Sequence, residues 1–163
     1  TMSIKDKIKA LKAQRKAIKP TGDTKPLDLA INQAETDELE LKKRKKEQEK
    51  QELINEAHQV IVRTYGALRR FNIIGTKWDM SDLFNRSRSY FLVLESRNNQ
   101  PIAYEDIKAL KENIQEIKYN LDFFLEERDE VYKEWVARKL DTVLSDIEKL
   151  ELKTLGVLYD IRY

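Results

Sequence analysis

The residues of this chain that could perform chemistry are few, and their spacing does not favour it. His58 is the only histidine, and the sequence contains no cysteine. His58 falls on an apolar helical face with Ile54 and Ile61, which favours a half-buried, hydrogen-bonded side chain over a catalytic one. Di-metal sites in helical bundles place a Glu three residues before each ligating His, but Asn55 holds that position here.

The other chemical patterns are equally sparse. Glu127, Glu130 and Glu134 share one helical face and could hold a cation, but a solvated acidic face explains the same spacing. The four glycines, at positions 22, 66, 75 and 156, are too scattered to form a phosphate-binding loop. We therefore expect no enzyme, no metal, no cofactor and no small-molecule substrate.

Basic residues gather in two stretches, residues 5–19 and residues 42–46. Residues 1–26 hold eight Lys and Arg against two Asp, whereas residues 102–163 hold ten basic and fifteen acidic residues. Both stretches could follow a phosphate backbone, but neither contains an aromatic residue for base stacking. The second stretch also precedes Glu47 and Glu49, at the spacing of ion pairs on an exposed helix. The candidate contacts are Lys5, Lys9, Lys12, Arg15, Lys16 and Lys19 in the first stretch, and Lys42, Lys43, Arg44, Lys45 and Lys46 in the second.

A long apolar stripe runs through the C-terminal third of the chain. In a hairpin of two helices it would lie opposite residues 42–52, which have no apolar side chain to cover it. Leaving five or six aliphatic side chains in water forfeits about 1.5–3 kcal/mol each. We therefore predict a partner-binding stripe, covered by the basic arm, a second copy or another protein. Its residues are Val136, Leu140, Val143, Leu144, Ile147 and Leu150.

Four helical segments must position these residues. A basic arm from about residue 3 to 19 ends in a linker between Pro20 and Pro26, because both prolines oppose a continuing helix. Residues 27–72 predict one helix of roughly 70 Å, and residues 73–101 a connector with a short helix. Residues from Tyr104 onward carry heptad spacing and predict a second long helix. The fold class is thus all-α: an elongated, antiparallel, coiled-coil-like hairpin of two long helices, with a short connecting helix and a basic N-terminal helical arm.

These elements favour assembly over chemistry. We divide the chain into an arm and linker, residues 1–26, and a hairpin domain, residues 27–163. The expected function is a non-enzymatic protein-interaction, scaffold or inhibitor module that binds itself, as a homo-oligomer, or another protein; the alternative is nucleic-acid binding. Small, lysine-rich, cysteine-free helical proteins are common among phage products, an analogy of composition alone. No apolar run approaches the roughly 18 residues of a membrane span, so we expect a cytoplasmic protein without a membrane partner.

Overall fold

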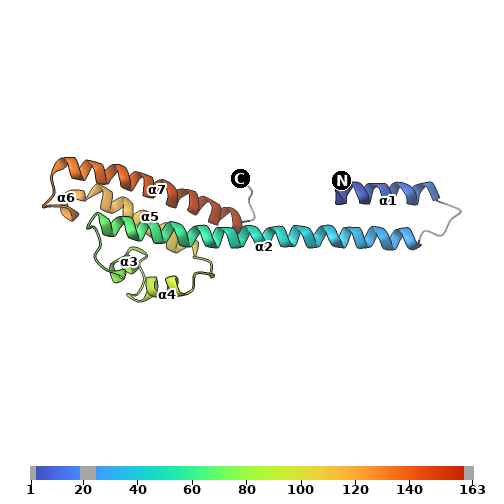
Figure 1. Cartoon of the computed structure of the whole chain (residues 1–163), viewed down its shortest axis with the longest axis horizontal. Helices are drawn as coiled ribbons and strands as arrows, with labels where there is room; N and C mark the ends of the chain where they lie inside the picture. The colour runs from blue at the N-terminus through green and yellow to red at the C-terminus, as the bar shows by residue number, and fades with distance from the viewer. Residues whose placement is uncertain (1–2, 19–24, 160–163) are drawn as a thin grey trace. The chain divides into compact units, whose positions relative to one another are not determined.

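The computed structural model describes residues 3–18 and 25–159, with the backbone alone at residues 15–18 and 25. These residues form helices and no strand, which confirms the all-α class (Figure 1). The chain divides into two units, Thr1–Glu49 and Lys50–Tyr163, whose boundary lies inside a helix; the boundary predicted from the sequence is residue 26. The helices are α1 (Ile4–Ile18), α2 (Lys25–Arg70), α3 (Lys77–Leu83), α4 (Tyr90–Ser96), α5 (Tyr104–Tyr119), α6 (Leu121–Phe124) and α7 (Glu130–Leu158).

The long helix predicted for residues 27–72 is confirmed as α2. Its 46 residues contain one proline, Pro26, which lies in the first turn, where a helix needs no backbone N–H from it. After that turn no proline interrupts the run, and Lys, Arg, Glu and Gln all have high helix propensity. Asn72, which follows α2, has a φ of 59°, so the chain leaves the helix through a left-handed residue.

Within the first unit, α1 lies against the N-terminal part of α2. The Ser3 hydroxyl begins α1 by accepting a hydrogen bond from the Asp6 N–H at 3.2 Å. Ile8 and Ile31 are buried, and Lys12 pairs with Glu35 at 3.4 Å between Nζ and Oε1. The predicted arm is therefore helical and contacts α2, while its predicted linker lies mainly outside the described residues.

The prediction of one long helix from Tyr104 to the C-terminus is wrong. The chain ends α5 at Tyr119, makes the short helix α6, and begins α7 at Glu130. Asp129 caps α7, because its Oδ1 accepts a hydrogen bond from the Tyr132 N–H at 2.8 Å. This reversal lays α5 beside α7 (Figure 1). The two-helix hairpin expected for residues 27–163 is not formed: in the C-terminal unit the end of α2 packs with α5 and α7, and α3 and α4 contribute to the same core.

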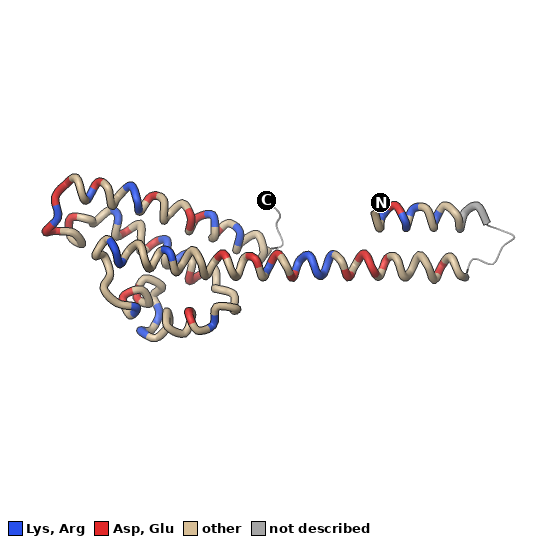
Figure 2. The backbone as a smooth tube through the Cα atoms, viewed as in Figure 1, with Lys and Arg blue, Asp and Glu red and all other residues tan. Residues whose placement is uncertain are grey.

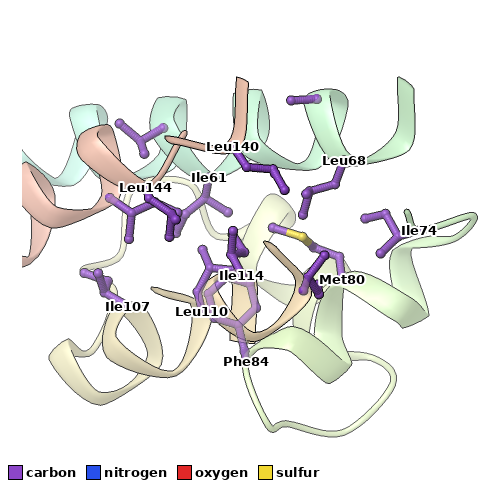
Figure 3. Close-up of a cluster of buried hydrophobic side chains, with 14 of the residues drawn as sticks. Ile61, Leu68, Ile74, Met80, Phe84, Ile107, Leu110, Ile114, Leu140 and Leu144 are labelled. Carbon is purple, nitrogen blue, oxygen red and sulfur yellow. The ribbon is translucent and has the colours of Figure 1, made fainter. Parts of the chain in front are cut away.

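One hydrophobic core holds the second unit together. Figure 3 shows Ile61 and Leu68 of α2 facing Leu110 and Ile114 of α5, with Leu140 of α7 on the same side of the core as Ile61 and Leu68. Met80 of α3 and Phe84, just after it, are each no more than 1% exposed and extend the same core. The core requires no residue before position 50, because all its members lie between Leu53 and Leu150.

Candidate protein-interaction surface

The apolar stripe predicted to bind a partner is not a surface. Five of its six residues are buried: Val136, Leu140 and Ile147 at 0% exposure, and Leu150 and Leu144 at 1% and 7%. Val143 is partly buried and packs against the same core. The expectation of an uncovered stripe is wrong because it placed α5 and α7 in one helix. After the reversal, α5 supplies the cover that residues 42–52 could not.

The predicted basic residues are exposed where the structure describes them. Lys5, Lys9 and Lys12 lie on the solvent side of α1, while the side chains of Arg15 and Lys16, and all of Lys19, lie outside the described residues. Lys42, Lys43, Arg44, Lys45 and Lys46 are all exposed on α2, and Figure 2 shows them as a continuous basic band. Lys42 lies 3.6 Å from Glu38, between Nζ and Oε1, one helical turn earlier.

A different surface emerges where α5 turns into α7. Here Tyr119 is 81% exposed, Phe123 79% and Val131 75%, values unusual for large apolar side chains. Phe124 and Trp135 are also exposed, and the rings of Phe123 and Phe124 meet edge to face at 5.4 Å between centroids. We call this set, completed by Tyr132 and Arg128, the aromatic tip.

Ring contacts connect the aromatic tip to the core beneath it. Trp135 meets buried Phe71 edge to face at 5.4 Å between centroids, and Tyr132 lies 5.8 Å from Trp135. The Arg128 guanidinium stands 4.8 Å from the centroid of the Tyr132 ring, a cation–π distance. The Tyr132 hydroxyl donates to the Phe71 carbonyl at 3.5 Å. Trp135 and Tyr132 are therefore held against the core, whereas the Phe123 ring contacts only the ring of Phe124.

A shallow cleft opens within the aromatic tip. Its volume is about 410 Å³, and it lies between Asn72, at the end of α2, and residues 123–128 of the turn. Its lining combines apolar Phe123, Phe124 and Leu125 with charged Glu126, Glu127 and Arg128. Such a mixed apolar and charged concavity can seat an apolar side chain while the rim contacts charged groups around it.

The turn beside the cleft is acidic. Between Asp122 and Glu134 the chain carries six carboxylates and two basic residues, a net charge of −4 (Figure 2). Asp122 accepts a hydrogen bond from Lys133 at 2.9 Å, and this contact raises the pKa of Lys133, so that ammonium is already engaged. Arg128 is engaged by the Tyr132 ring. Positive charge is also present near the cleft. Arg69 and Arg70 are exposed at the end of α2 and precede Asn72 in the sequence.

Sequence reasoning missed the aromatic tip because it placed Phe124, Val131 and Trp135 on the heptad-spaced apolar face of one continuous helix. One signal was present. Four of the five residues from Leu121 to Leu125 are apolar, and consecutive residues point to all sides of a helix. One buried face cannot accommodate all four, so the pattern indicates either a break or exposed rings. The structure contains both.

The remaining polar clusters are structural. His58 is buried as expected, and its Nε2 bonds to the Gln100 carbonyl at 2.8 Å. It borders a cleft of about 450 Å³ between α2 and α4, where Glu95 is paired with Lys77 at 2.8 Å. Among the described residues no group of His, Asp or Glu is placed to hold a metal ion. In that same part of the chain, every helix is too short or too polar to cross a membrane.

Comparisons of the chain with protein-family models, with curated proteins and with solved structures find no match. The class that the fold defines is an all-α protein whose C-terminal unit is a helical bundle with an exposed aromatic tip.

Proposed function

We propose that this chain is a non-enzymatic protein-interaction module that binds its partner through the aromatic tip. The supporting observation is the exposure of Phe123 and Val131, at 79% and 75%, in a unit that buries five of the six residues of the apolar stripe. Aromatic residues at the surface are enriched in interface cores and depleted elsewhere. Binding would bury Phe123 and its neighbours, and each fully covered side chain would contribute about 1.5–3 kcal/mol to the stability of the complex.

The rigidity of the aromatic tip also favours binding. Trp135 rests on Phe71 and contacts Tyr132, so little side-chain entropy is lost when a partner covers these two rings. The cleft beside Asn72 provides the concavity into which a partner side chain can anchor. No residue of the aromatic tip needs to perform chemistry in this role, because the partner would be held or occluded by contact alone.

Site-specific photo-crosslinking tests the proposal. A photoreactive phenylalanine analogue replaces Phe123 in the full chain, expressed in cells of the source organism, and the matched control replaces Leu92, which is 45% exposed on α4. We expect a discrete crosslinked product from position 123 and none from position 92. Val131→Ser should reduce the yield of that product because it removes a neighbouring apolar contact with the partner. Equal labelling from both positions, or none from position 123, would overturn the proposal.

Nucleic-acid binding is the second candidate, and the exposure of all five residues from Lys42 to Lys46 favours it. Binding to phosphates through such a band would fall steeply as salt rises. A gel shift with duplex and single-stranded nucleic acid at low salt tests it, with Lys43→Glu and Lys45→Glu together as the variant. Absence of a shift at low salt would end this candidate and leave the aromatic tip unaffected.

A further inference from the structure

We propose that the partner of the aromatic tip is a basic amphipathic helix of another protein. This inference rests on the proposed function and adds the chemistry of the occupant. Helices that dock in grooves present apolar anchors on one face, at i, i+3 or i+4, and i+7. The aromatic tip offers the exposed apolar side chains of Phe123, Val131 and Trp135, and carboxylates of the same turn would attract positive charge on the other face of such a helix.

Three carboxylates at the aromatic tip are free to bind a partner, whereas others in the unit already form ion pairs within the chain. Glu126, Glu127 and Glu134 are exposed and have no hydrogen-bond or ion-pair partner among the described residues. By contrast, Glu56 pairs with Lys153 and Glu151 with Lys111, each at 2.8 Å between nitrogen and oxygen. These pairs join α2 and α5 to α7, so they hold the unit together. The three carboxylates at the aromatic tip have no such internal role.

The shape of the cleft favours a side-chain anchor over a small molecule. At about 410 Å³ it lies near the lower end of ligand-binding pockets, about 300–1,000 Å³. A small-molecule pocket also positions buried polar groups, and here the polar residues stand on the exposed rim. An apolar side chain such as Leu or Phe can enter between Asn72 and Phe124. Lysines or arginines on the flanks of the same helix would then reach Glu126 and Glu127.

The chain's own basic helix is not the occupant that we infer. α1 already buries Ile8 within its own unit, where Lys12 pairs with Glu35. Using α1 to cover the aromatic tip of a second copy would expose Ile8 and Ile31, which are the buried apolar residues in the described part of that unit. A partner helix that arrives with its own apolar face incurs no such loss. Self-association is therefore an outcome that the experiment must separate.

Two model peptides provide the test. One is an 18-residue amphipathic helix with Leu on one face and Lys on the other, and its twin has Glu in place of every Lys. Both carry fluorescein, and their binding to the full chain is followed by fluorescence anisotropy. The chain has a net charge of +2, so overall charge does not draw the Lys peptide to it. We expect the Lys peptide to bind at least about tenfold more tightly than its twin, with an affinity that falls as salt rises.

Matched variants locate the binding. Phe123→Ser should weaken the binding of the Lys peptide, whereas Leu92→Ser, on α4, should leave it unchanged. Glu126→Gln with Glu127→Gln should reduce the preference for Lys over Glu, whereas Glu105→Gln with Glu112→Gln, on the exposed side of α5, should leave it intact. Circular dichroism of each variant establishes that the helices are retained. Loss of binding in both members of a pair would show that the contact lies elsewhere and would overturn the inference.

Other outcomes separate this inference from the proposed function. Equal binding of both peptides would reject a basic partner and leave the aromatic tip as an interaction surface. Concentration-dependent self-association in sedimentation, abolished by Phe123→Ser, would assign the surface to a second copy and overturn the inference. If neither peptide responds to Phe123→Ser and the photoreactive group at position 123 yields no product, both proposals fail.

Discussion

At the scale of single residues, the most constrained group is the carboxylate of Asp106. It is 5% exposed and receives two hydrogen bonds, from Arg86 Nε at 2.8 Å and from the Tyr90 hydroxyl at 2.6 Å. A buried carboxylate needs such donors, because removing it from water is costly. The contact fastens α4 and the turn before it to the first turn of α5. Burial first, and then the hydrogen bond to Asp106, raise the pKa of the Tyr90 hydroxyl.

This raised pKa predicts a loss of stability in alkaline solution. The protonated Tyr90 hydroxyl stabilises the fold fully below the pKa of an unfolded tyrosine, about 10, and the stabilisation is lost as pH rises through the higher folded pKa. We expect the free energy of unfolding to fall as pH rises above about 10. In Tyr90→Phe this part of the slope should disappear, although the variant is less stable at pH 7 because Asp106 loses a donor. Denaturant unfolding at several pH values measures both effects, with Tyr119→Phe, 81% exposed, as the control. Equal slopes in Tyr90→Phe and the unsubstituted chain would contradict this account.

At the scale of elements, α2 could be predicted from the sequence, and the α5–α7 reversal could not. Nothing that breaks a helix occurs within α2 after its first turn, so propensity and structure agree there. The region from Asn120 to Asp129 also lacks proline and glycine, and its reversal depends on the Asp129 cap and on the burial of Leu121 and Leu125. These are tertiary effects. A heptad pattern read through the reversal looks the same whether its two halves form one helix or pack against each other.

The candidate surface failed to appear in the sequence for the same reason. Trp135 and Phe124 have the spacing of core residues, and only the reversal decides which members of the heptad pattern face outward. A ring can be predicted to be exposed only when the position of the turn is known. Buried positions far from the turn, such as Leu140 and Ile147, were correctly placed on one face, but their cover was misjudged.

The charged part of α2 contributes no side chain to a hydrophobic core. Every residue from 41 to 52 is exposed, so the stability of the helix there depends mainly on its helix propensity. Substituting Lys45 and Gln48 by Gly should cost about 1 kcal/mol of local helix stability each. We expect amide hydrogen exchange to accelerate across residues 43–52, while the denaturation midpoint of the C-terminal unit stays unchanged. Alanine at the same two positions is the control, because it keeps the helix propensity. A shifted midpoint in the glycine variant would show that the run carries tertiary contacts.

At the scale of the whole molecule, the stripe belongs to the core of the C-terminal unit and not to an interface. Leu140→Ala should therefore destabilise the chain by about 2–5 kcal/mol, as cavities in cores do. Leu152→Ala, on the same helix but 53% exposed, should cost far less. Denaturant unfolding of the two variants makes the comparison. Equal costs, or a change of oligomeric state caused by Leu140→Ala without loss of stability, would restore the stripe as a docking face.

The interleaving of α2, α5 and α7 in one core has a consequence for biosynthesis. The apolar face that ends in Leu68 leaves the ribosome well before Leu140 and Ile147, which complete its cover. At about 5–20 residues per second, this delay is on the order of ten seconds. During that interval Ile61 and Leu68 have only part of their final neighbours, so the nascent chain is a client for holding chaperones until its last helix emerges.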